Sequence, residues 1–101
     1  MIAENHYDFL LRVELVDANF SPSQIARIWE EAPPEVLQIC SAFFAIAISQ
    51  KKSITEFLGN RKIMEREARR AEAHPDEQIH AVGEALLRLN SVLRQVSRPA
   101  S

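Results

Sequence analysis

Glycine is nearly absent from the sequence: Gly59 and Gly83 are the only two among 101 residues. A β-sheet protein of this length needs many tight turns, which depend on glycine, so the scarcity predicts an all-α fold. It also excludes the glycine-rich loops that hold nucleotide phosphates. The length suits one hydrophobic core. We therefore expect a single compact domain of about five helices over residues 1–97, with residues 98–101 as a frayed tail.

Cysteine occurs once, as Cys40, within an apolar run. A single thiol excludes an internal disulfide, fits a reducing compartment, and is expected to be a buried core group. The three histidines, His6, His74 and His80, have neither the spacing nor the partners of a zinc site. The apolar neighbours of Cys40 are also unlike the polar, electropositive setting of a catalytic thiol. The sequence thus predicts no catalytic residues, no metal ligands and no cofactor, which means a non-enzyme.

Long apolar runs are missing as well. No uninterrupted apolar stretch reaches the 18 or so residues that a membrane-spanning helix needs, so we expect no membrane segment. Glu4 and Asp8 occupy the region where a secretory signal would be basic. Together with the single cysteine, these features predict a cytoplasmic protein.

Positive charge is scarce outside one segment. The net charge is −5 over residues 1–50, +4 over residues 51–70 and −1 over residues 71–101. Because nucleic-acid affinity depends on neutralised phosphates, we expect any such contact in the middle segment. The residues chosen as auxiliary phosphate contacts form its densest positive stretches: Lys51, Lys52, Arg61 and Lys62. The alternative is that residues 61–73 form a solvated helix whose Glu and Arg side chains pair along its length.

Prolines and capping residues divide the chain into helices. Ser21 and Gln24 have the spacing of a capping box, and the Gly59–Asn60 pair is a helix-ending signal. Asp76 and Glu77 are placed to occupy a first helical turn. The predicted helices cover residues 5–18, the segment from Ser21 to Pro33, the segment from Pro34 to Ile48, a short helix capped by Ser53, residues 61–73, and the segment after Pro75.

The second and third of these helices meet at Pro33–Pro34, as in a helix-turn-helix corner. Ala26 is the candidate small residue of the first helix, and Val36 and Ile39 are the candidate locking residues of the second. Gln38 is the candidate for contacting a base, since glutamine pairs well with adenine. Glu35, at the head of that helix, would repel phosphate.

The third helix is apolar on nearly every side, which predicts a buried, central helix. Full cover in so small a protein requires other helices or a second copy of the chain. The last helix has apolar positions in alternating steps of three and four, which suits packing within the domain or against another chain equally well. These positions are Ile79, Val82, Leu86, Leu89, Leu93 and Val96.

Periodicity also selects candidate contacts for an oligomer. We expect a homodimer or higher oligomer, because both the apolar third helix and the regular seam of the last helix need partners. The residues chosen for this interface are Leu10, Leu11, Val36, Phe43, Phe44, Leu86, Leu89 and Leu93.

Three stretches of the chain resemble the FlhD family of small all-helical regulator subunits. They are YDFLLRVELV at residues 7–16, IARIWEEAPPEVLQIC at residues 25–40 and QIHAVGEALLRLNSVL at residues 78–93. The resemblance implies a subunit that dimerises by helix packing and assembles with a larger, zinc-containing FlhC-like subunit. That partner would make most of the DNA contacts, and the complex would activate transcription by recruiting RNA polymerase.

The sequence thus favours a non-catalytic subunit of a bacterial transcriptional activator, with little DNA affinity of its own. A small helical adaptor or secretion chaperone, which binds protein but no DNA, is the alternative. The net charge of +4 over residues 51–70 distinguishes them, because only the DNA-bound subunit needs it. An autonomous repressor is the third possibility, and the lack of a turn glycine and the position of Glu35 disfavour it.

Overall fold

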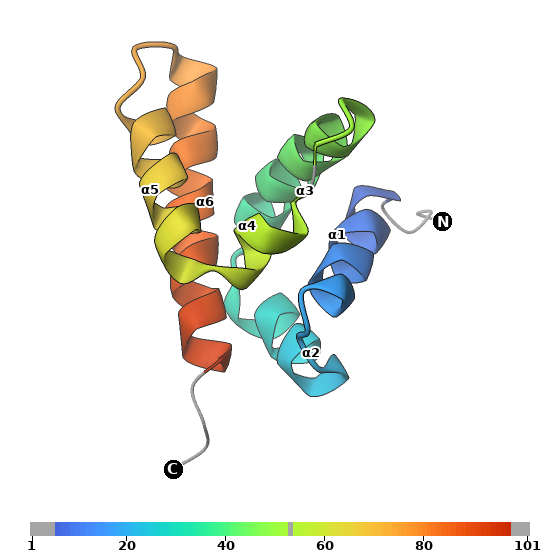
Figure 1. Ribbon diagram of the computed structural model, residues 1–101. Helices are drawn as coiled ribbons and strands as arrows, with labels where there is room; N and C mark the ends of the chain where they lie inside the picture. Colours follow the sequence, from blue (N-terminus) through green and yellow to red (C-terminus); the bar gives the residue numbers. More distant parts are fainter. Residues whose placement is uncertain (1–5, 53, 98–101) are drawn as a thin grey trace.

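The structure is a computed structural model that describes residues 6–52 and 54–97. Within these residues it contains helices and no strand, so the all-α prediction is confirmed (Figure 1). The described residues form six helices in one globule, one for each of the six helical segments delimited from the sequence. They are α1 (His6–Asp17), α2 (Pro22–Glu31), α3 (Pro34–Ser49), α4 (Thr55–Gly59), α5 (Arg61–Glu72) and α6 (Glu77–Val96).

The helix starts follow the capping residues closely. Ser21 and Gln24 form the predicted capping box: the Gln24 amide donates to Ser21 Oγ, and the Ser21 amide donates to Gln24 Oε1. Asp76, expected within the first turn of the last helix, is instead the N-cap of α6: it accepts from the amides of Gln78 and Ile79, and the helix starts at Glu77. The predicted cap of the short helix, Ser53, lies outside the described residues, and Ile54 takes the cap position of α4.

Two helices end in the same left-handed turn. Asn19 follows α1 with φ 74°, and Lys51 follows α3 with φ 62°. After α3, the Lys52 amide donates to the Ala47 carbonyl and the Lys51 amide to the Ile48 carbonyl, which is the Schellman pattern. Glycine is the usual residue at this position, so Lys51 occupies a conformation that disfavours a side chain.

α3 is the centre of the fold, as predicted, and its neighbours cover most of its faces. Five of its apolar side chains are buried, and the helix packs against α1 on one side and α6 on the other. The prediction of a helix buried on nearly every side is wrong at one position, because Ile46 is 57% exposed. The five buried side chains are Val36, Leu37, Cys40, Phe44 and Ala47.

α5 and α6 form an antiparallel hairpin that stands beside the rest of the molecule (Figure 1). Gly83 lies where the two helices come closest. A Cβ at this position would clash with the backbone nitrogen of Glu72 and lie 2.7 Å from the carbonyl oxygen of Ala68. Both obstacles are backbone atoms of α5, so only glycine allows the two helices this separation.

The corner between α2 and α3 differs from the predicted helix-turn-helix packing. Ala26, the proposed small contact residue, is exposed, whereas Ile25 and Ile28 are the buried residues of α2. α2 packs on α1 and α6, and Gln24 Nε2 donates to the carbonyl of Val96 at 3.0 Å. The proline pair therefore redirects the chain toward α6 instead of clamping two helices together.

Candidate nucleic-acid interface

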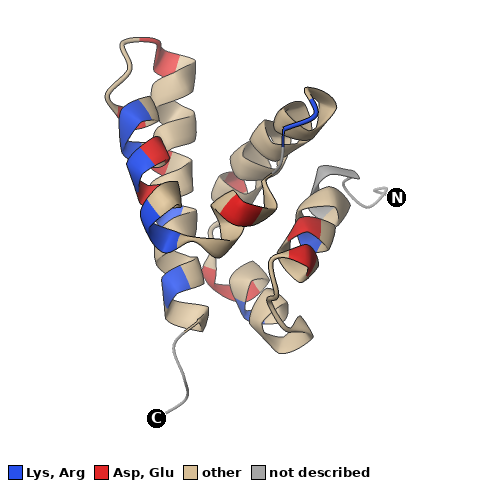
Figure 2. Cartoon of the chain, in the orientation of Figure 1, with Lys and Arg blue, Asp and Glu red and all other residues tan. Residues whose placement is uncertain are grey.

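The basic segment predicted from the sequence is divided in space. Lys51 and Lys52 lie in the turn after α3, whereas Lys62 lies in the first turn of α5, at the other side of α4 (Figure 2). Both lysine groups are exposed. The four residues chosen as phosphate contacts therefore do not form one surface.

Arg61 is used inside the fold. Its guanidinium donates to the carbonyl of Leu58 and to Asn90 Oδ1, the latter at 2.8 Å, and so joins the α4–α5 turn to α6. Burial, and then the nearby Arg94, lower the pKa of Arg61 to about 10. Buried Asn90 also donates back to the Arg61 carbonyl. This guanidinium is committed to the α4–α5–α6 junction, which leaves it poorly placed for the predicted phosphate contact.

The outer face of α5 carries a regular basic row. Lys62, Arg66 and Arg69 follow the four-then-three spacing that puts residues on one side of a helix. All three are exposed, and buried Met64 and Ala68 occupy the opposite face. We call this row the α5 basic row.

Neighbouring carboxylates partly neutralise the positive charge of the α5 basic row. Arg69 pairs with Glu65 at 3.1 Å, and Arg66 pairs with Glu67 at 3.4 Å. The pairing along a solvated helix that the sequence also suggested is thus present, and such exposed pairs contribute about 0–1 kcal/mol each. They are weak enough to open when a phosphate approaches, and Lys62 has no ion pair within the described residues.

Arg94 of α6 extends the row, which was not predicted. It reaches Glu65 at 3.7 Å, so Arg69 and Arg94 share one carboxylate across the hairpin. In Figure 2 the blue segments gather along α5 and continue onto the lower part of α6. The helical spacing of Lys62, Arg66 and Arg69 is visible in the sequence, whereas the contribution of Arg94 depends on how the hairpin is paired.

Gln38 is exposed on α3, as a base-reading side chain would have to be. Glu35 lies one turn before it and is also exposed. A hollow next to this turn is lined by Glu35, Glu72 and Glu84 together with Arg88. Gln38 therefore lies near a hollow with an acidic rim, whose charge is opposite to that of the α5 basic row.

The residues predicted for an oligomer interface divide into two groups. Leu10 and Phe43 are partly exposed and remain available to a partner. The other six are covered by the chain's own helices, although Leu86 also forms part of the wall of an open groove. These are Leu11, Val36, Phe44, Leu86, Leu89 and Leu93. The last helix accordingly packs within the domain through Leu86, Leu89, Leu93 and Val96, while Ile79 remains exposed.

Cys40 is fully buried, as expected for a core thiol. Loss of hydration raises its pKa to about 12, so the group is a neutral thiol at ordinary pH. Among the described residues, no three His, Cys, Asp or Glu side chains are grouped to hold a metal ion. The described helices include none with the length and apolar character needed to cross a membrane.

Comparisons with protein-family models, with curated proteins and with solved structures found no match to this chain.

Proposed function

We propose that the protein is a non-catalytic subunit of a transcriptional activator, which uses the α5 basic row as an auxiliary phosphate contact. In this proposal it forms an oligomer and assembles with a larger FlhC-like subunit that holds zinc and reads the DNA. The complex would then recruit RNA polymerase at promoters.

The observation that carries the proposal is the placement of charge. The chain is acidic overall, yet Lys62, Arg66 and Arg69 share one exposed helix face and Arg94 lies beside them. A straight row of cations on a helix can lie along a phosphate backbone. The attraction between them is electrostatic and does not depend on the base sequence. Three cations give only weak binding, which suits a subunit whose partner supplies the main contacts.

The test is the salt dependence of DNA binding. The chain alone should bind a duplex of about 30 base pairs only at concentrations of about 10 µM or more at physiological salt, as measured by fluorescence anisotropy. With a purified FlhC-like subunit, the triple variant Lys62→Glu, Arg66→Glu, Arg69→Glu should reduce the slope of log K against log salt by about one per residue.

The matched control is Arg27→Glu, which removes an exposed arginine paired with a carboxylate four residues away, as Arg69 is, but on α2. It should leave the slope unchanged. Tight, sequence-specific binding by the chain alone would contradict the subunit role. An unchanged slope for the triple variant would remove the α5 basic row from the DNA contact.

The rival function is that of a helical adaptor or secretion chaperone that binds only protein. An open apolar groove between α3 and the α5–α6 hairpin favours this alternative, because such grooves accept helices. If neither the native chain nor the triple variant alters DNA binding by an FlhC-like partner, the result supports the adaptor function.

A further inference from the structure

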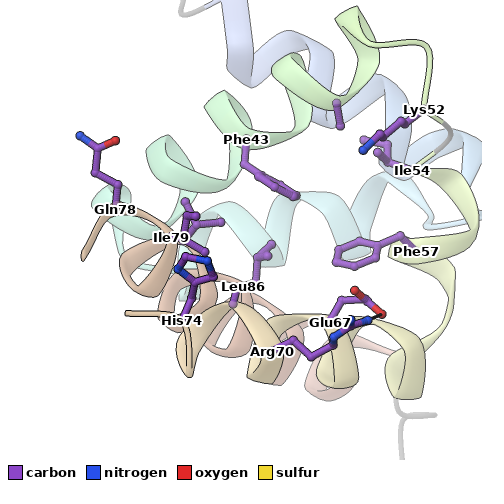
Figure 3. A pocket seen from close by; sticks show the side chains of 13 residues that line it. Phe43, Lys52, Ile54, Phe57, Glu67, Arg70, His74, Gln78, Ile79 and Leu86 are labelled. Atoms are coloured by element: carbon purple, nitrogen blue, oxygen red, sulfur yellow. Dashed lines mark hydrogen bonds and ion pairs between the residues drawn. The ribbon is translucent and has the colours of Figure 1, made fainter. Parts of the chain in front are cut away.

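A groove opens between α3 and α4 on one side and the α5–α6 hairpin on the other. It encloses about 630 Å³, and Phe43, Phe57 and Leu86 point into it from three different helices (Figure 3). Ile79 and Val82 continue its apolar wall along α6. This is the part of the α6 seam that the chain's own core leaves open, since Ile79 is 40% exposed. An apolar surface of this kind is a binding site for another apolar surface.

The rim of the groove carries more positive than negative charge. Lys52 lies at one edge, and Arg70 lies at the other, where it pairs with Glu67 at 3.5 Å (Figure 3). The groove therefore favours an apolar helix that has acidic residues beside its apolar face.

The chain itself presents such a helix. Phe9, Val13 and Val16 follow the four-then-three spacing on α1, and they are 55%, 39% and 57% exposed. They lie opposite the fully buried Leu11 and Leu15, so this apolar row faces away from the core. α1 carries three acidic residues against one basic residue, and Asp17 lies exposed beside the row.

A chain cannot fill its own groove with this row. α1 packs against α2, α3 and α4, and Figure 1 places α3 and α4 between α1 and the hairpin. The apolar row and the groove therefore belong to two separate surfaces of the molecule, each without a partner in the single chain.

We propose that the apolar row of α1 in one copy docks into the groove of a second copy. The two surfaces match in length, since Phe9 and Val16, like Ile79 and Leu86, are seven positions apart along a helix, or about 10 Å. They also match in charge, because Asp17 lies exposed beside the row, and Lys52 and Arg70 lie at the edges of the groove. This contact rests on the oligomeric part of the proposed function and makes it specific.

The contact joins two different surfaces, which gives it a testable property. Each chain carries one row and one groove, so copies associate either reciprocally as a closed pair or head to tail. In both cases a chain with a damaged row keeps its groove, and a chain with a damaged groove keeps its row. Two such chains should associate with each other although neither associates with itself.

Sedimentation velocity on the full chain tests this directly. Val16→Glu places a charge in the row and Ile79→Arg places one in the groove, and both sites are exposed, so folding should be preserved. At concentrations where the native chain is oligomeric, each variant alone should sediment as a monomer. An equimolar mixture should form a two-chain species, and circular dichroism of each variant checks its helix content.

Ile46→Glu is the matched control, since Ile46 is 57% exposed, like Val16, but lies on α3 outside both surfaces. It should leave the oligomer intact. A monomeric native chain, or a mixture of the two variants that stays monomeric, would overturn the proposed contact. A row-to-row contact between two α1 helices would give a different result, because Ile79→Arg keeps its row and would then still pair with itself.

The experiment needs neither DNA nor an FlhC-like subunit. Failure of this contact would leave the α5 basic row and its salt test untouched. Failure of DNA binding would equally leave the sedimentation result standing.

Discussion

Gly83 allows the close approach of α5 and α6, a role that its position inside a helix does not suggest. Glycine inside a helix normally costs about 1 kcal/mol relative to alanine, so a sequence pattern suggests a weak point there. Neither glycine of the chain has a positive φ, and backbone freedom is therefore not the reason for it. The reason is the backbone of α5, which leaves no room for a Cβ.

Gly83→Ala should lower the free energy of unfolding by about 3 kcal/mol, because α5 and α6 must move apart to admit the methyl group. Chemical denaturation followed by circular dichroism measures this. Gly59→Ala is the control: the nearest atoms lie 4.0 Å from its Cβ, so the change should be neutral or stabilising by up to about 1 kcal/mol. Equal effects at the two positions would contradict the close approach.

Single residues also mark where sequence and structure disagree. Arg61 and Lys62 are adjacent and equally basic in the sequence, yet one side chain is held by Leu58 and Asn90 and the other is exposed. A count of charges treats them alike. Only the position of α6, which brings Asn90 to Arg61, separates their roles.

At the scale of helices, the sequence predicted boundaries well because the determinants are local. Ser21, Gln24, Pro33 and Pro34 act within one turn, and the observed ends of α2 and α3 follow them. The α5–α6 pairing could not be predicted in the same way. It depends on the close approach of Gly83 in α6 to the backbone of Ala68 and Glu72 in α5. This approach is a tertiary contact, which no local sequence signal reveals.

His80 joins the two helices of the hairpin in a pH-dependent way. Its ring contacts the Glu72 carbonyl at the end of α5, and Nε2 lies 3.4 Å from the Glu84 carboxylate. The carbonyl contact first, and then the charges of Glu84 and Glu72, raise the pKa of His80 above its usual 6.5. The protonated ring thus binds the folded hairpin better than the neutral ring.

A raised pKa in the folded state stabilises the protein below pH 6.5 or so and loses that effect as the pH rises through the folded value. The melting temperature should therefore fall as the pH rises above about 6.5, and His80→Gln should flatten this fall. His74→Gln, which changes a histidine outside this contact, should keep it. A His80→Gln variant with the native pH dependence would exclude the hairpin contact as its source.

At the scale of the whole molecule, the hairpin is attached to the other helices through few specific polar contacts. One is Gln24, whose two ends serve different purposes: Oε1 caps α2, and Nε2 donates to the Val96 carbonyl at the end of α6. That carbonyl belongs to the last turn of a helix, where carbonyls lack partners within the helix. The capping role was predictable from Ser21, whereas the second role required the fold.

Gln24→Glu separates these two roles. The introduced carboxylate still accepts from the Ser21 amide, but it cannot donate to Val96 and instead opposes its carbonyl. We expect a loss of about 1–2 kcal/mol in the free energy of unfolding, measured by chemical denaturation. Lowering the pH to protonate the introduced carboxylate should recover part of this loss, relative to the native chain at the same pH. No loss at neutral pH would show that the Gln24–Val96 contact contributes nothing.

The all-α architecture was predictable from the scarcity of glycine and the apolar spacing, and the α5 basic row was partly predictable from its periodicity. The groove was not, since its walls come from α3, α4, α5 and α6. Ile79 and Val82 of the α6 seam are left partly open, while the other four positions are buried. No feature of these equivalent sequence positions distinguishes the open ones from the buried ones.

The buried thiol of Cys40 provides a probe of how often the central helix opens. A disulfide reagent reacts with thiolate, and in the closed structure Cys40 is neither accessible nor ionised. Labelling therefore requires an opening of the structure that exposes α3. The labelling rate accordingly reports how often the central helix becomes exposed. Because the chain has no second cysteine, every labelling event reports from that one place.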